Sequence, residues 1–162
     1  MQLRPATPAD FKAVLALNEE SVAHLSPLDD ILLAQLHTEA ALHLVVEEKG
    51  TVIAFLIAFR EGSEYDSPNY VWFAERYERF LYVDRVVVAR TAKSRGAGSM
   101  LYRELFAFAA RNSVTLVTCE YDVEPPNADS ERFHSRFGFR EVGRQAVSGG
   151  RKVVSLQAVK VG

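Results

Sequence analysis

The feature that most constrains the fold is the stretch of residues 80–110. Residues 81–89 are nearly all apolar and rich in valine, a pattern that suits a strand buried on both faces. Two glycines and three basic side chains follow in the sequence RTAKSRGAGS. Apolar side chains then recur at helical spacing at Ala97, Leu101, Leu105 and Phe108. We therefore predict a central strand, a basic loop and a long helix.

A glycine-rich loop between a strand and a helix is typical of an anion site. Backbone N–H groups converge at the start of a helix, and the helix dipole favours negative charge there. Arg90, Lys93 and Arg95 add positive charge, which indicates a phosphate or a pyrophosphate. The alternative is an ordinary connection with a solvated basic rim.

Spacing separates the known phosphate motifs. The P-loop pattern G-x-x-x-x-G-K-[ST] is absent. A dinucleotide fingerprint is closer, with Gly96 and Gly98 after a strand and Glu120 about twenty residues on. However, Leu101 occupies its third glycine position, and six residues separate the strand from Gly96. An NAD-binding enzyme stays open as an alternative.

Two motifs resemble a known family. Residues 93–98, KSRGAG, resemble the acyl-CoA signature of the GCN5-related N-acetyltransferase (GNAT) superfamily, in which a basic residue or Gln precedes x-x-G-x-G/A. Residues 127–139, NADSERFHSRFGF, resemble the late helix of that family, N-x-x-A-x-x-F-Y-x-x-x-G-F. Ser130 replaces Ala and His134 replaces Tyr in this second motif. Residues 62–79 are the part of the chain least like the family.

The resemblance implies an α/β (α+β) fold, with one mixed, mostly antiparallel sheet of about seven strands and helices on both faces. Its fourth and fifth strands, residues 81–89 and 114–121, are expected to form a splayed parallel pair. The length of 162 residues predicts a single domain over residues 1–162.

The resemblance also implies acetyl-CoA as co-substrate and residues that bind it. Pantetheine is expected along the backbone of the fourth strand at Val86, Val87 and Val88, and the pyrophosphate at the loop. The implied loop contacts are Lys93, Ser94, Arg95, Gly96, Ala97, Gly98 and Ser99. The late helix is expected to contribute Asn127, Ser130 and Phe133.

Acyl transfer, with acetyl as the expected group, requires a base. The implied acceptor is a primary amine of a small molecule or peptide, and at a pKa near 10 only about one amine in a thousand is neutral at pH 7. Asp84 and Glu120 are the candidate bases, because burial in apolar strands raises the pKa of a carboxyl group. For Asp84 the alternative role is a salt bridge with Arg85.

His134 is the candidate proton donor to the departing CoA thiolate. Ser130, Phe133, His134 and Phe137 recur at i, i+3, i+4 and i+7, which places His134 on the inward face of its helix. In many relatives a tyrosine at this position protonates the thiolate. The alternative is a packed core histidine.

Residues 62–79 are rich in aromatic and acidic side chains, and two roles are open. The segment is either a loop over the acceptor, with Tyr65, Tyr70 and Trp72 as binding residues, or a short helix that packs its aromatic rings on the core or on a second subunit. A homodimer is therefore one possible assembly.

Helix signals recur near the N-terminus. Thr7 and Pro8 are typical of a helix start, and Ser26 repeats the signal before a second helix. We expect that helix to bury Leu28, Ile31, Leu32 and Leu36. Hairpins are predicted for residues 42–60 around a turn at 48–50, and for residues 139–161.

Composition excludes several classes. A net charge of −2 lacks the basic bias of nucleic-acid binders, and no apolar run approaches the roughly 20 residues that span a bilayer. Cys119 is the only cysteine, and the N-terminus lacks an export signal, so a cytoplasmic protein is expected. His24, His37 and His43 lack metal-ligand spacing, so no metal is expected. A non-catalytic acyl-CoA-binding or sensing module is the alternative function.

Overall fold

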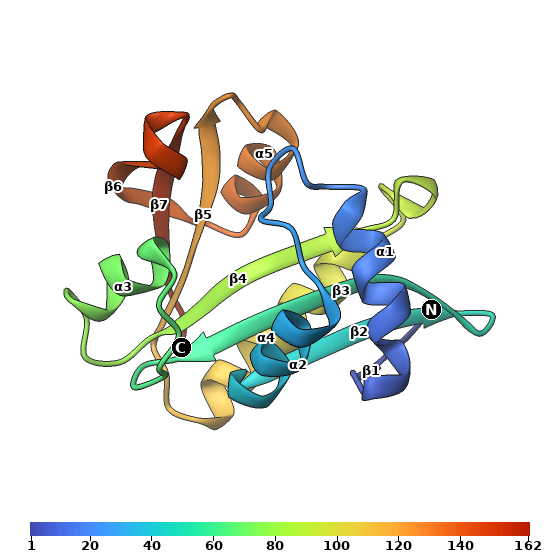
Figure 1. Ribbon diagram of the computed structural model, residues 1–162. Helices are drawn as coiled ribbons and strands as arrows, with labels where there is room; N and C mark the ends of the chain where they lie inside the picture. Colours follow the sequence, from blue (N-terminus) through green and yellow to red (C-terminus); the bar gives the residue numbers. More distant parts are fainter. The chain divides into compact units, whose positions relative to one another are not determined.

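The computed structural model describes residues 1–162 and contains a seven-stranded sheet with the strand order β1-β2-β3-β4-β5-β7-β6 (Figure 1). The strands are β1 (Gln2–Pro5), β2 (Leu42–Glu48), β3 (Thr51–Arg60), β4 (Leu81–Val88), β5 (Leu116–Glu124), β6 (Arg140–Val147) and β7 (Lys152–Lys160). The α-helices are α1 (Phe11–Glu19), α2 (Asp30–Glu39), α3 (Pro68–Ala74), α4 (Ala97–Arg111) and α5 (Ala128–Arg136). β4 and β5 pair in parallel, whereas β1 with β2, β2 with β3, β5 with β7 and β6 with β7 pair antiparallel, so the mixed, mostly antiparallel sheet is confirmed.

Contacts divide the chain into two compact units. The first unit contains residues 1–59 and 84–108, and the second contains residues 60–83 and 109–162. The boundary falls within β4, between Val83 and Asp84. The single domain expected from length stays a prediction.

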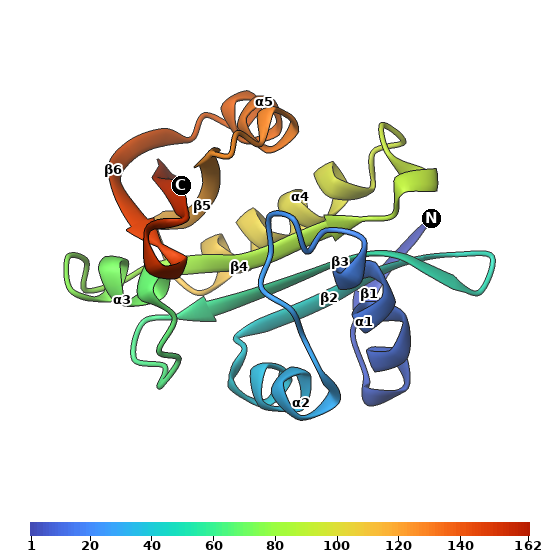
Figure 2. The same ribbon diagram turned by 45° about the horizontal axis from the view of Figure 1, so that its top comes forward.

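The first unit is built on antiparallel pairs of β1 with β2 and β2 with β3. Lys49 and Gly50 join β2 to β3 with φ values of 51° and 79°, the positive values that a tight hairpin turn requires. The predicted hairpin is thus confirmed. Figure 2 shows α1 and α2 on one face of these strands and α4 on the other.

The predicted buried face of α2 is only partly right. Asp29, not Ser26, caps this helix, because its carboxylate accepts a hydrogen bond from the N–H of Leu32 at 2.8 Å. Leu33 and Leu36 form the inward face of α2, and both are buried. Ile31 is 74% exposed and Leu32 37% exposed, so their predicted burial was wrong, and Leu28 is only half-buried.

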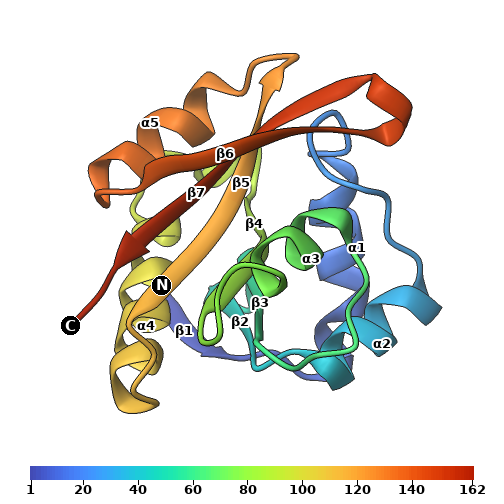
Figure 3. The ribbon, with the colours of Figure 1, turned by 90° about the vertical axis from the view of Figure 1, so that its left-hand side faces the viewer.

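The second unit contains β5 between β4 and β7, with β6 at the edge (Figure 3). β5 pairs antiparallel with β7 over most of its length, whereas its parallel pairing with β4 consists of Leu81 with Val117 and Tyr82 with Thr118. Two residues beyond Thr118, β5 carries Glu120. The parallel pairing of β4 with β5 therefore ends two residues before Glu120, the candidate base on β5.

The two faces of β5 are covered by different helices. Neighbouring strand residues point to opposite faces. Glu120 accepts a hydrogen bond from Asn69 of α3, while the ring of Tyr121 lies 6.0 Å from that of His134 of α5. α3 therefore lies on the Glu120 face and α5 on the Tyr121 face.

Residues 62–79 contain a short packing helix, α3, which is one of the two alternatives considered for this segment. Tyr70 and Phe73 of α3 are buried, and each packs within 6.3 Å of the rings of Phe80 and Tyr82. On the same helix, Trp72 lies so close to β6 that a Cβ atom on Gly143 would be 2.4 Å from Cζ2 of its ring. The indole thus occupies the space that a side chain at position 143 would need.

Candidate active site

The loop after β4 carries the features of an anion site on its backbone. A 3-10 turn (Arg90–Ala92) leads to Ser94 and Gly96, which have φ values of 63° and 92°. The carbonyl of Gly96 accepts the hydrogen bond from Met100 N–H at 3.0 Å, which makes Gly96 the residue that precedes α4. The N–H groups of Ala97, Gly98 and Ser99 therefore begin the helix without intrahelical acceptors.

Gly96 is required by its backbone conformation. No atom lies within 4 Å of the position where its Cβ would stand, so space does not demand glycine there. A φ of 92° is instead a value that residues with side chains rarely adopt. Gly96 thus sets the path by which the exposed loop enters α4.

Two arginines of the loop have acidic or carbonyl partners within the first unit. Arg95 binds both carboxylate oxygens of Glu48 at 2.6 and 2.7 Å, which holds the pKa of Glu48 below its usual value. Arg90 donates to the carbonyl of Glu20 at 2.9 Å. Lys93, Ser94 and Gly96 of the loop are also exposed.

Val86, Val87 and Val88 lie at the end of β4, in the first unit. Val87 is buried at 3% exposure, whereas Val86 and Val88 are half-buried. The N–H of the next residue, Ala89, pairs with the carbonyl of Ile53 at 2.8 Å. This end of β4 therefore lies beside β3.

Asp84 forms a buried ion pair. Its Oδ2 lies 2.7 Å from Nε of Arg85, and the two side chains are 5% and 4% exposed, respectively. Arg85 also donates to Oδ1 of Asn18 at 3.0 Å and to the carbonyl of Ser26 at 3.1 Å. The ion pair considered for Asp84 from the sequence is present, and its role as a base stays a prediction.

Glu120 has neutral hydrogen-bond donors. The hydroxyl of Tyr82 lies 2.6 Å from its Oε1 and 3.0 Å from its Oε2, and Nδ2 of Asn69 donates to Oε1 at 2.9 Å. Gln145 of β6 in turn donates to Oδ1 of Asn69 at 2.8 Å. The half-buried carboxylate of Glu120 thus joins residues from α3, β4 and β6.

His134 is buried and neutral at pH 7. Burial lowers its pKa to about 4, and its Nδ1 lies 2.8 Å from the backbone carbonyl of Ser130. A carbonyl only accepts, so Nδ1 carries the hydrogen, which leaves Nε2 of the neutral ring as an acceptor. This geometry weighs against a proton donor and favours the packing alternative.

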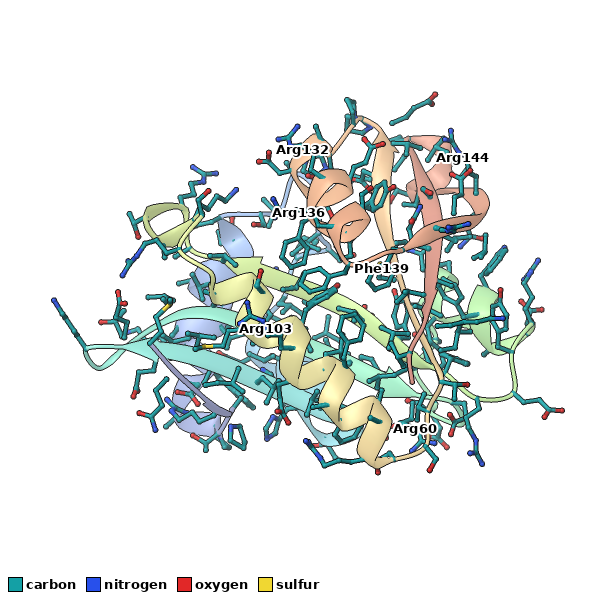
Figure 4. All side chains as sticks on the ribbon, turned by 180° about the vertical axis from the view of Figure 1, so that it is seen from behind. Arg60, Arg103, Arg132, Arg136, Phe139 and Arg144 are labelled. Atoms are coloured by element: carbon teal, nitrogen blue, oxygen red, sulfur yellow. The ribbon has the colours of Figure 1, made fainter.

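Of the other residues predicted on the late helix, Asn127 caps its start and Phe133 packs within it. Oδ1 of Asn127 accepts from the N–H of Ser130 at 3.3 Å, and the ring of Phe133 lies 5.1 Å from that of Phe137. Arg132 and Arg136 are exposed on the same helix (Figure 4). The predicted roles of Asn127, Ser130 and Phe133 in CoA binding stay predictions.

Among the predicted acceptor residues, Tyr70 is 2% exposed. Its hydroxyl donates to the carbonyl of Arg60 at 2.6 Å and accepts from the N–H of Ser63 at 3.1 Å. Tyr65 and Trp72 are half-buried, and the ring of Tyr65 lies 5.7 Å from that of Tyr70. Tyr70 therefore acts as a packing residue, while Tyr65 and Trp72 keep part of their surface exposed.

The structure contains no group of three or more His, Cys, Asp or Glu residues that could hold a metal ion. None of its helices has both the length and the apolar character needed to cross a membrane.

The family model of the acetyltransferase (GNAT) family matches residues 11–139. This chain belongs to the GNAT family. A phosphinothricin N-acetyltransferase from Streptomyces coelicolor is 48% identical to it over 59 residues, which are 36% of this chain and 33% of that relative. The chain thus matches about a third of the length of this curated relative.

Two solved structures share the fold of this GNAT protein. Ard1 from Thermoplasma volcanium has a TM-score of 0.80 at 17% identity, with 99% of this chain and 97% of that chain covered. The putative acetyltransferase yncA from Salmonella typhimurium, solved with its cofactor acetyl-CoA, has a TM-score of 0.75 at 19% identity, with 100% and 94% covered.

Sequence reasoning on this GNAT chain missed three side chains around Glu120, namely Asn69, Tyr82 and Gln145. Only Tyr82 carried a usable signal, because a tyrosine inside an apolar strand needs a partner for its hydroxyl. Asn69 and Gln145 lie 51 and 76 residues from their partners in the sequence, and no short motif joins them.

Proposed function

We propose that this GNAT protein transfers an acetyl group from acetyl-CoA to a primary amine of a small molecule or peptide. The observation that carries the acceptor chemistry is the half-buried carboxylate of Glu120, two residues beyond the last parallel pair of β4 and β5. Tyr82 and Asn69 hold this group through hydrogen bonds. A carboxylate of this kind can accept a proton from an ammonium group.

The loop after β4 supports binding of acetyl-CoA. The N–H groups of Ala97, Gly98 and Ser99 at the start of α4, with the exposed Lys93, match the needs of a pyrophosphate. Pantetheine would lie along Val86, Val87 and Val88. The presence of acetyl-CoA in the yncA structure supports the same choice of co-substrate.

In the proposed reaction, Glu120 takes one proton from the protonated amine. The neutral nitrogen then forms a bond to the acyl carbon, and the carbon–sulfur bond breaks with its electron pair on sulfur. The second amine proton leaves with the thiol product.

Asp84 is the weaker candidate for the base. Protonation of its carboxylate would leave the guanidinium of Arg85, which is 4% exposed, without its ion-pair partner. The donors to Glu120 described above, Tyr82 and Asn69, are neutral side chains. We therefore assign the base to Glu120 and a positioning role in β4 to Asp84.

The proposal is tested by release of CoA thiol from acetyl-CoA in the presence of a panel of primary amines, followed by mass measurement of the products. Amine-dependent thiol release with a mass gain of one acetyl group is the expected result. Acetyl-CoA binding by calorimetry without turnover on any amine would instead support the acyl-CoA sensor, an alternative that the neutral, buried His134 favours. Preferential binding of NAD over CoA would support the alternative of an NAD-binding enzyme.

A further inference from the structure

A chain of hydrogen bonds runs across the second unit from β6 to β4. Gln145 Nε2 donates to Asn69 Oδ1 at 2.8 Å and to the carbonyl of Pro68 at 3.2 Å. Asn69 Nδ2 donates to Glu120 Oε1 at 2.9 Å, and the hydroxyl of Tyr82 lies 2.6 Å from the same oxygen. One carboxylate oxygen therefore receives donors from both sides.

The direction of these bonds fixes the amide of Asn69. The side-chain nitrogen of Gln145 can only donate, so it requires the oxygen of Asn69 to face it. The nitrogen of Asn69 then faces Glu120. Gln145 thus selects the one orientation of Asn69 in which its amide donates to the carboxylate.

α3 is anchored by two residues that follow Asn69. The next residue, Tyr70, is buried and bonded through its hydroxyl to Arg60 and Ser63. Trp72, one turn further on, lies against Gly143 of β6. The amide of Asn69 is therefore carried by a helix that packing holds in place.

We propose that Asn69 and Gln145 are positioning residues that orient Glu120 for proton abstraction, so that α3 acts on the chemical step as well as on packing. This inference rests on the proposed function of Glu120 as the base. The donors from Asn69 and Tyr82 fix the rotation of the carboxylate about its last torsion, which broad rotamer preferences leave open. A fixed carboxylate meets the amine at one angle, and such pre-orientation raises the rate.

The test replaces Asn69 by Ala and by Asp, with Val71→Ala as the matched control. Val71 lies on the same helix and is 37% exposed. We expect Asn69→Ala to lower kcat about tenfold with unchanged affinity for acetyl-CoA. Asn69→Asp should move the acid limb of the kcat profile to higher pH, since a second carboxylate beside Glu120 favours its protonated form.

A double variant separates positioning from packing. In a Glu120→Gln background, Asn69→Ala should cause little further loss of kcat, because residues that act as a unit are not additive. Gln145→Leu should reproduce a part of the Asn69→Ala effect. The proposal would be overturned if Asn69→Ala lowered kcat by the same factor in the parent protein and in Glu120→Gln. It would also be overturned if Asn69→Ala and Val71→Ala had the same kinetics.

A second measurement does not depend on turnover. Carbon-detected NMR of the Glu120 carboxyl group should show a pH titration that changes in Asn69→Ala and Asn69→Asp and stays unchanged in Val71→Ala. An unchanged titration in both Asn69 variants would refute the inference. Absence of turnover by the parent protein, with the expected change in titration, would refute the proposed function and leave the orientation of Glu120 by Asn69 supported.

Discussion

The two candidate bases lie on the two central strands but have opposite kinds of partner. In the first unit, Asp84 faces the guanidinium of Arg85, and both side chains are almost completely buried. In the second unit, Glu120 is half-buried and receives donors from the neutral side chains of Tyr82 and Asn69. The comparison shows that acidity in a strand is insufficient to identify a base. The charge of the partner decides whether a carboxylate can accept a proton without leaving another buried charge unpaired.

The largest effect is expected for Glu120→Gln. Removal of the base should lower kcat about 10³-fold, within the usual range for general base catalysis, while the Kd for acetyl-CoA stays within about twofold. Steady-state kinetics and calorimetry measure the two quantities. Asp84→Asn is the matched variant, and a larger loss of kcat there than in Glu120→Gln would reverse the comparison.

Arg85→Met tests the other half of the comparison. It leaves Asp84 as a buried carboxylate without its ion-pair partner, which should lower the free energy of unfolding by about 3 kcal/mol. Urea denaturation measures this loss. The double variant Asp84→Asn/Arg85→Met should recover part of the stability, and failure to recover any would show that Arg85 acts mainly through Asn18 and Ser26.

Each unit also contains one buried histidine, and both should make stability depend on pH. Burial lowers the pKa of His43 and of His134 to about 4, so between pH 6.5 and pH 4 the unfolded chain gains protons that the folded chain does not. The free energy of unfolding should therefore contain the full contribution of each histidine above pH 6.5. It should fall as pH falls, by up to about 3 kcal/mol for each histidine. Denaturation of His43→Phe and His134→Phe at pH 7 and pH 4.5 measures the two contributions. If a variant loses as much free energy of unfolding between pH 7 and pH 4.5 as the parent protein, the histidine that it lacks does not make this contribution.

Gly96→Ala should affect the co-substrate step alone. A positive φ at this residue should cost about 1 kcal/mol once a Cβ is present, so we expect the affinity for acetyl-CoA to fall about fivefold. Calorimetry measures the affinity. The kcat at saturating acetyl-CoA should match that of the parent, and a large change in kcat would connect this loop with the amine step.

For His134→Phe we expect only a small change in kcat. Because the neutral ring donates to Ser130 through Nδ1, it has no hydrogen to offer the thiolate at pH 7. We expect kcat to change by less than about threefold between pH 6 and pH 9. A loss of about 10²-fold would instead restore His134 as the proton donor.

Local patterns were sufficient for single turns and helix starts, whereas the expected sheet came from the resemblance to the GNAT family. The hairpin turn at Lys49 and Gly50, the glycine before α4 and the cap at Asn127 are all set by neighbouring residues, and each was visible in the sequence. α2 shows the limit of this approach, since Asp29 caps it instead of Ser26, and its buried residues include Leu33, which was not predicted.

The surroundings of Glu120 could not be derived in this way. The carboxylate was visible in an apolar strand, but its donors Asn69 and Tyr82 lie 51 and 38 residues away in the sequence. Hydrogen bonds of this range depend on how the strands and α3 pack, which periodicity does not specify. The same holds for the ion pair of Asp84, where sequence adjacency suggested Arg85 but could not show that Asn18 binds it too.

The contact between Trp72 and Gly143 gives the protein an internal optical probe. Trp72 is the only tryptophan in the chain, and its ring is held between β6 on one side and the guanidinium of Arg76 at 3.9 Å. Its emission therefore reports on the attachment of α3 to β6, within the second unit. A fluorescence change during titration with an amine would place the acceptor near this helix.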